Sequence, residues 1–238
     1  MFAGALLRLD DAFASVASPA SIAACPCCPE PADYAALLRT PRHQLTGIEL
    51  GSFAFRVMNT VCSAAELRYF AGRILQLVHG GDQRMPDMEV VYGKLRRADW
   101  QSWAQAAALA EVFDALWDSM FAAAAPRTGV DTVLCALGAA EPSIAGRLVA
   151  WERLDSARSI RNLHEFVVRG CRRRGGGLVP RNSYWDRRWA TYGELVAWLG
   201  RLPAAVNSAF DRVDDAESLE LLAATHDVLE GARPSAAE

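Results

Sequence analysis

Apolar residues recur at helical spacing through most of this chain of 238 residues. After Ser63, and again after Trp103, they stand mostly three or four positions apart. The two series are Leu67, Phe70, Ile74, Leu77, Val78 and Leu109, Val112, Phe113, Leu116, Met120, Phe121. This interval places the members of a series on one face of an α-helix. The pattern therefore predicts amphipathic helices, and the second series predicts a long one.

Residue pairs with capping-box spacing are expected to begin four of these helices. In a capping box, the N-cap side chain and a carboxylate three positions later satisfy free N–H groups of the first turn. The pairs are Thr46 with Glu49, Ser63 with Glu66, Ser183 with Asp186, and Asp214 with Glu217. Prolines and glycines are expected to mark helix ends. They are Pro41, Pro86, Pro126, Pro142, Pro203, Gly80, Gly81 and Gly231.

Strand signals are weak, since the two candidates, residues 130–137 and 166–168, lie inside longer helical patterns. We therefore expect an all-α fold, a compact multi-helix bundle or helix-pair stack of roughly ten or eleven helices. One helical domain is expected over residues 1–238, with a Pro/Cys loop at 19–31. Residues 175–182 are expected to be a flexible connection, and a C-terminal helical subdomain from about residue 183 is the alternative division.

The composition is globular, with 52% hydrophobic and 22% charged residues, and the net charge of −3 excludes a polyanion-binding charge over the whole chain. The most apolar stretch, residues 105–125, carries Glu111, Asp114 and Asp118 and is therefore not expected to span a membrane. Residues 22–25 are similar to a lipoprotein cleavage site, but charges at positions 8, 10 and 11 interrupt the apolar run that a secretory signal needs. We expect a cytoplasmic protein whose six cysteines are thiols.

The cysteine loop is the first candidate for chemistry. Cys25 and Cys28 have the spacing that lets one zinc ion bind both thiolates, and Cys27 is a third candidate ligand. A structural zinc site takes four ligands. The fold would have to supply the rest from Cys62, Cys135, Cys171 or His43. The alternatives are dithiol exchange, which favours a βαβ context, and a loop that packs against the helices without metal.

An arginine-rich segment is the second candidate. Residues 147–190 hold eleven arginines against four acidic residues, whereas residues 191–238 hold three arginines against nine. Arginines that contact phosphate, with interleaved aromatic rings that stack on bases, are typical of nucleic-acid binding. The candidate anion contacts are Arg172, Arg173, Arg174, Arg187 and Arg188, and the interleaved rings are Tyr184, Trp185, Trp189 and Tyr192. The alternatives are an anionic protein partner, and a basic stretch that neutralises the acidic C-terminal helices while its tryptophans join the core.

Familiar catalytic motifs fail at required positions. Gly93-Lys94 lacks the earlier glycine and the following Ser or Thr of a phosphate loop, so Lys94 is expected on a helix surface. His164-Glu165 lacks the second histidine of a zinc protease, so His164 is expected to be a half-exposed helical residue. Trp100 and Trp103 are expected to anchor the core, with an exposed aromatic patch for a partner helix as the alternative.

Several short fragments occur in a defined order along the chain. They include Cys25-Pro26-Cys27-Cys28, Leu67-Arg68-Tyr69-Phe70, Gly93-Lys94-Leu95, the pair Trp100 and Trp103, and Val196-Ala197-Trp198-Leu199. With them the chain resembles a bacterial protein family of high-GC genomes that has no known function. The resemblance implies a cytoplasmic bacterial protein and carries over no catalytic residue. The family pattern has a histidine at the position of Tyr69, so a metal site using that histidine would lack a ligand in this chain.

These observations favour a non-enzymatic protein-interaction or accessory module, because no catalytic constellation is recognisable. Another protein is the expected partner. The alternatives are nucleic-acid or anion binding through residues 147–190 and zinc binding through the Cys25–Cys28 loop.

Overall fold

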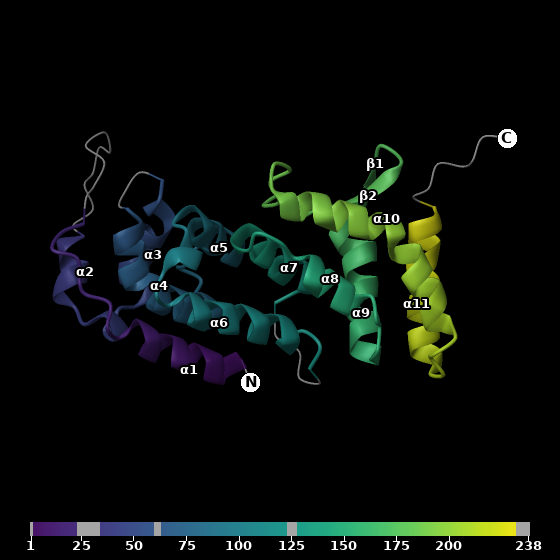
Figure 1. The fold of residues 1–238 in the computed structure, drawn as a ribbon, viewed down its shortest axis with the longest axis horizontal. Helices are drawn as coiled ribbons and strands as arrows, with labels where there is room; N and C mark the ends of the chain where they lie inside the picture. The colour runs from purple at the N-terminus through teal and green to yellow at the C-terminus, as the bar shows by residue number, and fades with distance from the viewer. Residues whose placement is uncertain (1, 23–33, 60–62, 123–127, 232–238) are drawn as a thin grey trace. The chain divides into compact units, whose positions relative to one another are not determined.

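The computed structural model describes residues 2–22, 34–59, 63–122 and 128–231. Over these residues the chain forms eleven α-helices and one two-stranded sheet (Figure 1), which confirms the prediction of an all-α fold. The chain divides into two compact units, Met1–Leu116 and Trp117–Glu238. The expected single domain, with residues from about 183 as a subdomain, stays a prediction.

The first unit is built around one central helix. Its helices are α1 (Phe2–Phe13), α2 (Ala35–Arg39), α3 (Gly47–Arg56), α4 (Ala64–His79), α5 (Met88–Arg97) and most of α6 (Ala106–Ser119). Helix α4 contacts α1, α3 and α5. The predicted apolar face of α4 is buried at Leu67, Phe70 and Ile74. Its burial is the packing that makes a helix of this length stable.

Two of the four expected capping boxes are confirmed. The backbone N–H of Thr46 donates to Glu49 Oε2 at 2.7 Å, and that of Ser63 donates to Glu66 Oε2 at 3.0 Å. In each pair the N-cap side chain completes the box, so α3 and α4 begin where the sequence predicts. Hydrogen bonds from Thr46 lower the pKa of the Glu49 carboxyl, since they stabilise its charged form.

Lys94 does not lie on a helix surface, so that expectation is wrong. Its side chain is buried, and its ammonium donates to the carbonyls of Phe55 at 2.7 Å and Val57 at 2.8 Å. Phe55 belongs to the last turn of α3 and Val57 is its C-cap residue, where the helix has no further N–H groups to bond the carbonyls. Lys94 on α5 therefore caps the C-terminus of α3.

The paired tryptophans anchor the core of the first unit, as expected. Trp100 and Trp103 are 5% and 7% exposed. Trp100 packs edge-on against Phe113 of α6, and Trp103 packs edge-on against Phe13 of α1. The alternative of an exposed aromatic patch at these two residues is therefore wrong.

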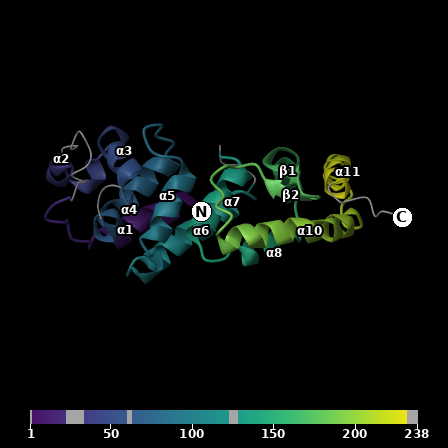
Figure 2. The ribbon, with the colours of Figure 1, turned by 90° about the horizontal axis from the view of Figure 1, so that it is seen from above.

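The second unit combines five helices with a hairpin. Its elements are α7 (Val130–Ala140), α8 (Ala145–Trp151), α9 (Ala157–Glu165), a π-helical turn η3 (Phe166–Gly170), β1 (Cys171–Arg174), β2 (Gly177–Pro180), α10 (Ala190–Phe210) and α11 (Ala216–Glu230). Helices α9 and α11 lie side by side in Figure 1, and Figure 2 shows the hairpin next to α10. Trp151 and Trp198 stack at 5.4 Å between ring centroids and form the centre of an aromatic core.

Three helix ends in the second unit differ from expectation. Pro203 lies buried inside α10 instead of ending a helix, so burial of its ring offsets the hydrogen bond that proline cannot donate. Helix α10 begins at Ala190 and not after Ser183, because Asp186 accepts hydrogen bonds from Arg188 in the preceding turn. Asp215, one residue after the expected Asp214, caps α11 by accepting from the Ser218 N–H at 2.8 Å.

Candidate anion-binding site

The expected flexible connection around residues 175–182 is instead part of a β-hairpin. Strands β1 and β2 pair antiparallel, with Arg172 opposite Val179 and Arg174 opposite Gly177. The two-residue turn consists of Gly175 and Gly176, whose φ angles are 57° and 81°. Two positive φ angles in succession are what a two-residue hairpin turn of type I′ needs, and glycine adopts them without strain. The Gly-Gly pair was therefore a hairpin signal in the sequence.

The three arginines of β1 lie on both faces of this hairpin, because side chains alternate along a strand. On the inner face, Cys171 and Leu178 are buried, and the Arg173 guanidinium lies against Gly231 at the C-terminal end of α11. A cation at that end of a helix interacts favourably with its free carbonyls. Arg172 and Arg174 alternate with these residues and share the other face. We call Arg172 and Arg174 the outward arginine pair.

The outward arginine pair is exposed and carries uncompensated charge. Over the described ranges, neither side chain has an ion pair or a hydrogen bond to a protein group. Two strand positions span roughly 7 Å, so the two guanidinium groups present a compact double positive charge. A pair of this kind is able to bind neighbouring anionic groups with charge-assisted hydrogen bonds.

The two later candidate arginines differ from this pair. Arg188 forms an ion pair with Asp186 at 2.6 Å, and its hydrogen bonds lower the pKa of Asp186 to about 2. Its charge is therefore compensated within the protein. Arg187 is exposed, and no acidic partner is found for it in the part of the chain that the structure describes.

Of the four aromatic residues that interleave with the arginines, one is buried, and Trp189 and Tyr192 are half-buried. Trp185 is 7% exposed, and its ring lies against Gly138 of α7. Tyr192 packs edge-on against Trp185, while Tyr184 is 42% exposed. The core alternative is thus confirmed for Trp185, and its ring cannot stack on a base.

Part of the arginine-rich segment neutralises acidic helices, as the alternative predicted. Arg161 of α9 contacts Glu217 of α11 at 2.6 Å, as that alternative requires. Arg201 of α10 contacts Glu152 at 3.1 Å, with the charges of the two segments the other way round. These pairs are partly exposed and contribute little to stability. Their role is to cancel charge, which leaves the hairpin as a place where positive charge is not cancelled.

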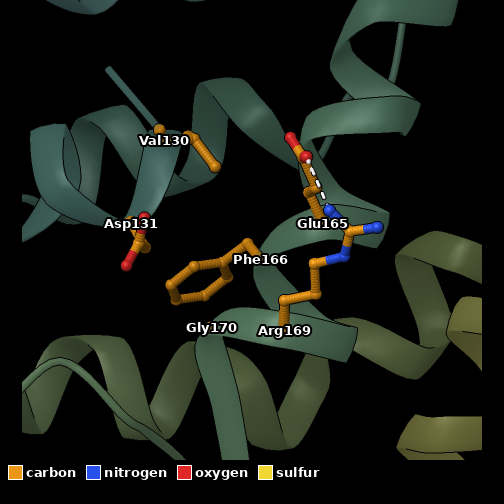
Figure 3. Close-up of a pocket in the computed structure, with 7 residues that line it drawn as sticks. Val130, Asp131, Glu165, Phe166, Arg169 and Gly170 are labelled. Atoms are coloured by element: carbon orange, nitrogen blue, oxygen red, sulfur yellow. Dashed lines mark hydrogen bonds and ion pairs between the residues drawn. The ribbon is translucent and has the colours of Figure 1, made fainter. Parts of the chain in front are cut away.

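A small cavity of about 170 Å³ lies where the π-helical turn leads into β1 (Figure 3). Phe166 lies between Asp131 on one side and the ion pair of Glu165 and Arg169 on the other. A Cβ at Gly170 would lie 3.1 Å from the Phe166 ring, so glycine lets the chain turn closely past it. Because two carboxylates offset the single Arg169, this cavity does not favour an anion.

The proposed zinc ligands Cys25, Cys27 and Cys28 lie outside the described residues, as does Cys62. Of the groups expected to complete the site, Cys135 and Cys171 are buried in the second unit and form no disulfide among the described residues. Burial raises the pKa of the Cys171 thiol to about 12, which disfavours the thiolate that zinc binds. No cluster of three or more ligand side chains occurs within the described residues. Zinc binding through the Cys25 loop stays a prediction.

Two histidines have structural surroundings. His164 is half-buried, as expected, with Nδ1 3.3 Å from the Thr225 hydroxyl of α11. His79 Nε2 lies 3.0 Å from the hydroxyl of the fully buried Tyr92. Burial lowers the pKa of His79 to about 4, so this ring is neutral at physiological pH. No local pattern predicts this contact, because Tyr92 lies on α5 and His79 on α4.

Comparison with models of protein families, with curated proteins and with solved structures finds no match for this chain. The resemblance to a bacterial family therefore stays an expectation. Across the residues with described positions, none of the helices is both long and apolar enough to cross a membrane.

Proposed function

We propose that this protein is a non-enzymatic interaction module that binds an anionic macromolecule through the outward arginine pair, Arg172 and Arg174. One observation carries the proposal: two exposed guanidinium groups stand on one face of a hairpin, and neither has a carboxylate partner among the described residues. Unpaired positive charge that the fold holds in place favours an anionic partner.

The packing of the hairpin supports this role. Strand β2 contacts α10, and the inner-face Arg173 lies against the end of α11, so the hairpin rests on two helices. The arginine pair is therefore presented on fixed backbone instead of on a flexible loop. A preorganised contact surface loses less conformational entropy on binding. The sequence-based expectation of a protein partner is one form of this proposal, and the expectation that the module is not an enzyme remains a prediction.

Retention on an immobilised polyanion such as heparin tests this proposal. We expect the unmodified chain to elute at higher salt than the double variant R172Q/R174Q. The matched control is R56Q/R153Q, which removes the same charge from two exposed arginines without side-chain partners in the described structure. Equal elution of the two double variants would contradict the proposal, because it would assign the retention to net charge alone.

A further inference from the structure

We propose that the anionic partner is double-stranded DNA, and that the hairpin of β1 and β2 enters its major groove with Arg172 and Arg174 on the phosphate backbone. This inference rests on the proposed function and assigns the class of partner. It uses three properties of the second unit: the shape of the hairpin, the burial of the neighbouring aromatic rings, and the residues of the outward face.

The shape of the hairpin fits the groove of a B-form duplex. Paired strands lie about 5 Å apart, and the major groove is about 12 Å wide, so it admits a two-stranded ribbon. The turn of Gly175 and Gly176 has no side chains, so the tip adds little width. The major groove of A-form RNA is deep and narrow, which makes duplex RNA the poorer match.

The aromatic residues argue against single-stranded nucleic acid. Proteins that bind single strands stack bases on exposed aromatic rings. Here Trp185 is buried against Gly138, and Tyr192 packs edge-on against it. Of the four interleaved rings, Tyr184 is exposed, whereas Trp189 and Tyr192 are half-buried and Trp185 is buried. Contacts from guanidinium groups to phosphates need no unstacked base, so a duplex suits the surface better.

The outward face argues against an acidic protein as the partner. Opposite Arg172 and Arg174 stand Val179 and Gly177, which supply little apolar area. Protein–protein interfaces depend on buried aromatic or aliphatic anchors at their centre. Protein–DNA interfaces are more polar and more positively charged. A face of two arginines, a glycine and a half-buried valine therefore suits an interface with DNA better than one with a protein.

Weak dependence on base sequence follows from placing both arginines on phosphates, which carry no base identity. Residues 171–180 also include no Asn or Gln, the residues that read adenine in the major groove. Each arginine on a phosphate releases condensed counterions, so log K falls with log salt by about 0.9 per contact. Removing two such contacts is expected to reduce the magnitude of the slope by about 1.8 and the affinity by roughly 60-fold at 0.1 M salt.

The test uses the full chain and a labelled DNA duplex of about two helical turns. Fluorescence anisotropy is measured from about 0.05 to 0.2 M salt, a range in which phosphate contacts lose most of their affinity. We expect the unmodified chain to bind the duplex and R172Q/R174Q to bind it about 60-fold more weakly at 0.1 M salt. The variant R172K/R174K is expected to keep most of the affinity, and R56Q/R153Q is expected to change it little. Thermal melting of each variant shows that the fold is intact.

The other probes are the separated DNA strand, an RNA duplex of the same sequence, and poly-glutamate. Binding of the single strand or the RNA duplex as tightly as the DNA duplex would overturn the assignment of partner. Binding of poly-glutamate but not DNA would keep the proposed function and replace the partner with an acidic protein. If no polyanion binds, the proposed function and this inference both fail.

Discussion

The ammonium nitrogen of Lys94 lies 2.7 Å from the carbonyl oxygen of Phe55, and this bond joins α5 to the end of α3. A second bond reaches the carbonyl of Val57 at 2.8 Å. Arg97, one turn later, donates to the carbonyl of Met58 and to the side chain of Asn59. Lys94 is the single lysine of the chain. Its position makes it part of the structure of the first unit and not part of a nucleotide site.

Replacing Lys94 by methionine is expected to destabilise the first unit by about 2–4 kcal/mol, because one buried and one part-buried carbonyl lose their donor. Urea unfolding measures the change. The control is R56M, which alters an exposed arginine of α3. A loss of stability in K94M no larger than in R56M would show that water replaces the ammonium without cost.

The stability difference between the unmodified chain and K94M is expected to depend on pH. Burial, with a contribution from nearby Arg97, lowers the pKa of Lys94 from 10.5 to about 8. Between these two pH values the unfolded chain binds more protons than the folded chain, so the Lys94 contribution rises with pH. Urea unfolding at several pH values in this window measures the difference. A difference that stays constant with pH would contradict the lowered pKa.

Acid is expected to destabilise the protein through His79 before most carboxylates titrate. Burial lowers the pKa of His79 from 6.5 to about 4. Between pH 6.5 and 4 the unfolded chain therefore binds a proton that the folded chain does not. The free energy of unfolding is expected to fall by up to about 3 kcal/mol as the pH is lowered through this window. Unfolding of H79Q is expected to depend less on pH in this window. If both proteins lose stability in parallel, His79 is not the cause.

Gly138 is expected to tolerate no side chain. A Cβ at this position would lie 2.5 Å from two ring carbons of Trp185, and the ring is buried. We expect G138A to destabilise by about 1–3 kcal/mol, since Trp185 must move. The control is G200A in α10, where no neighbouring atom lies within 4 Å of the new Cβ. Because alanine has the higher helix propensity, G200A is expected to stabilise the protein by about 0.5–1 kcal/mol. Equal effects of the two substitutions on thermal melting would contradict this packing.

Arg173 is expected to behave differently from its neighbours. Because its guanidinium lies against the end of α11, R173Q is expected to lower stability by about 0.3–1 kcal/mol. R173Q is expected to weaken polyanion binding less than R172Q does, because Arg172 lies on the outward face of the hairpin. Melting temperature and heparin elution, measured on both single variants, separate the two roles. If R173Q lowered the salt concentration of heparin elution more than R172Q, the assignment of Arg172 to the outward face and Arg173 to the inner face would be wrong.

Local signals account for the elements that the sequence predicted correctly. The apolar series of α4 and α6 and the capping boxes at Thr46 and Ser63 act within a few residues, so their effect does not depend on the rest of the fold. Ser183 and Asp186 have the same spacing and begin no helix, because Asp186 bonds Arg188 instead. Spacing alone could not distinguish these outcomes, since the competing partner was equally close in sequence.

The helical class of this protein follows from the amino-acid sequence without tertiary information, because helix periodicity and capping chemistry are local. The sequence also placed the positive charge in one segment of the chain. The tertiary structure decided which of those charges are free. Arg173 lies against Gly231, Arg161 pairs with Glu217, and Arg172 and Arg174 face outward. The partners of Arg161, Arg173 and Trp185 stand tens of residues away, and only the folded chain brings them into contact.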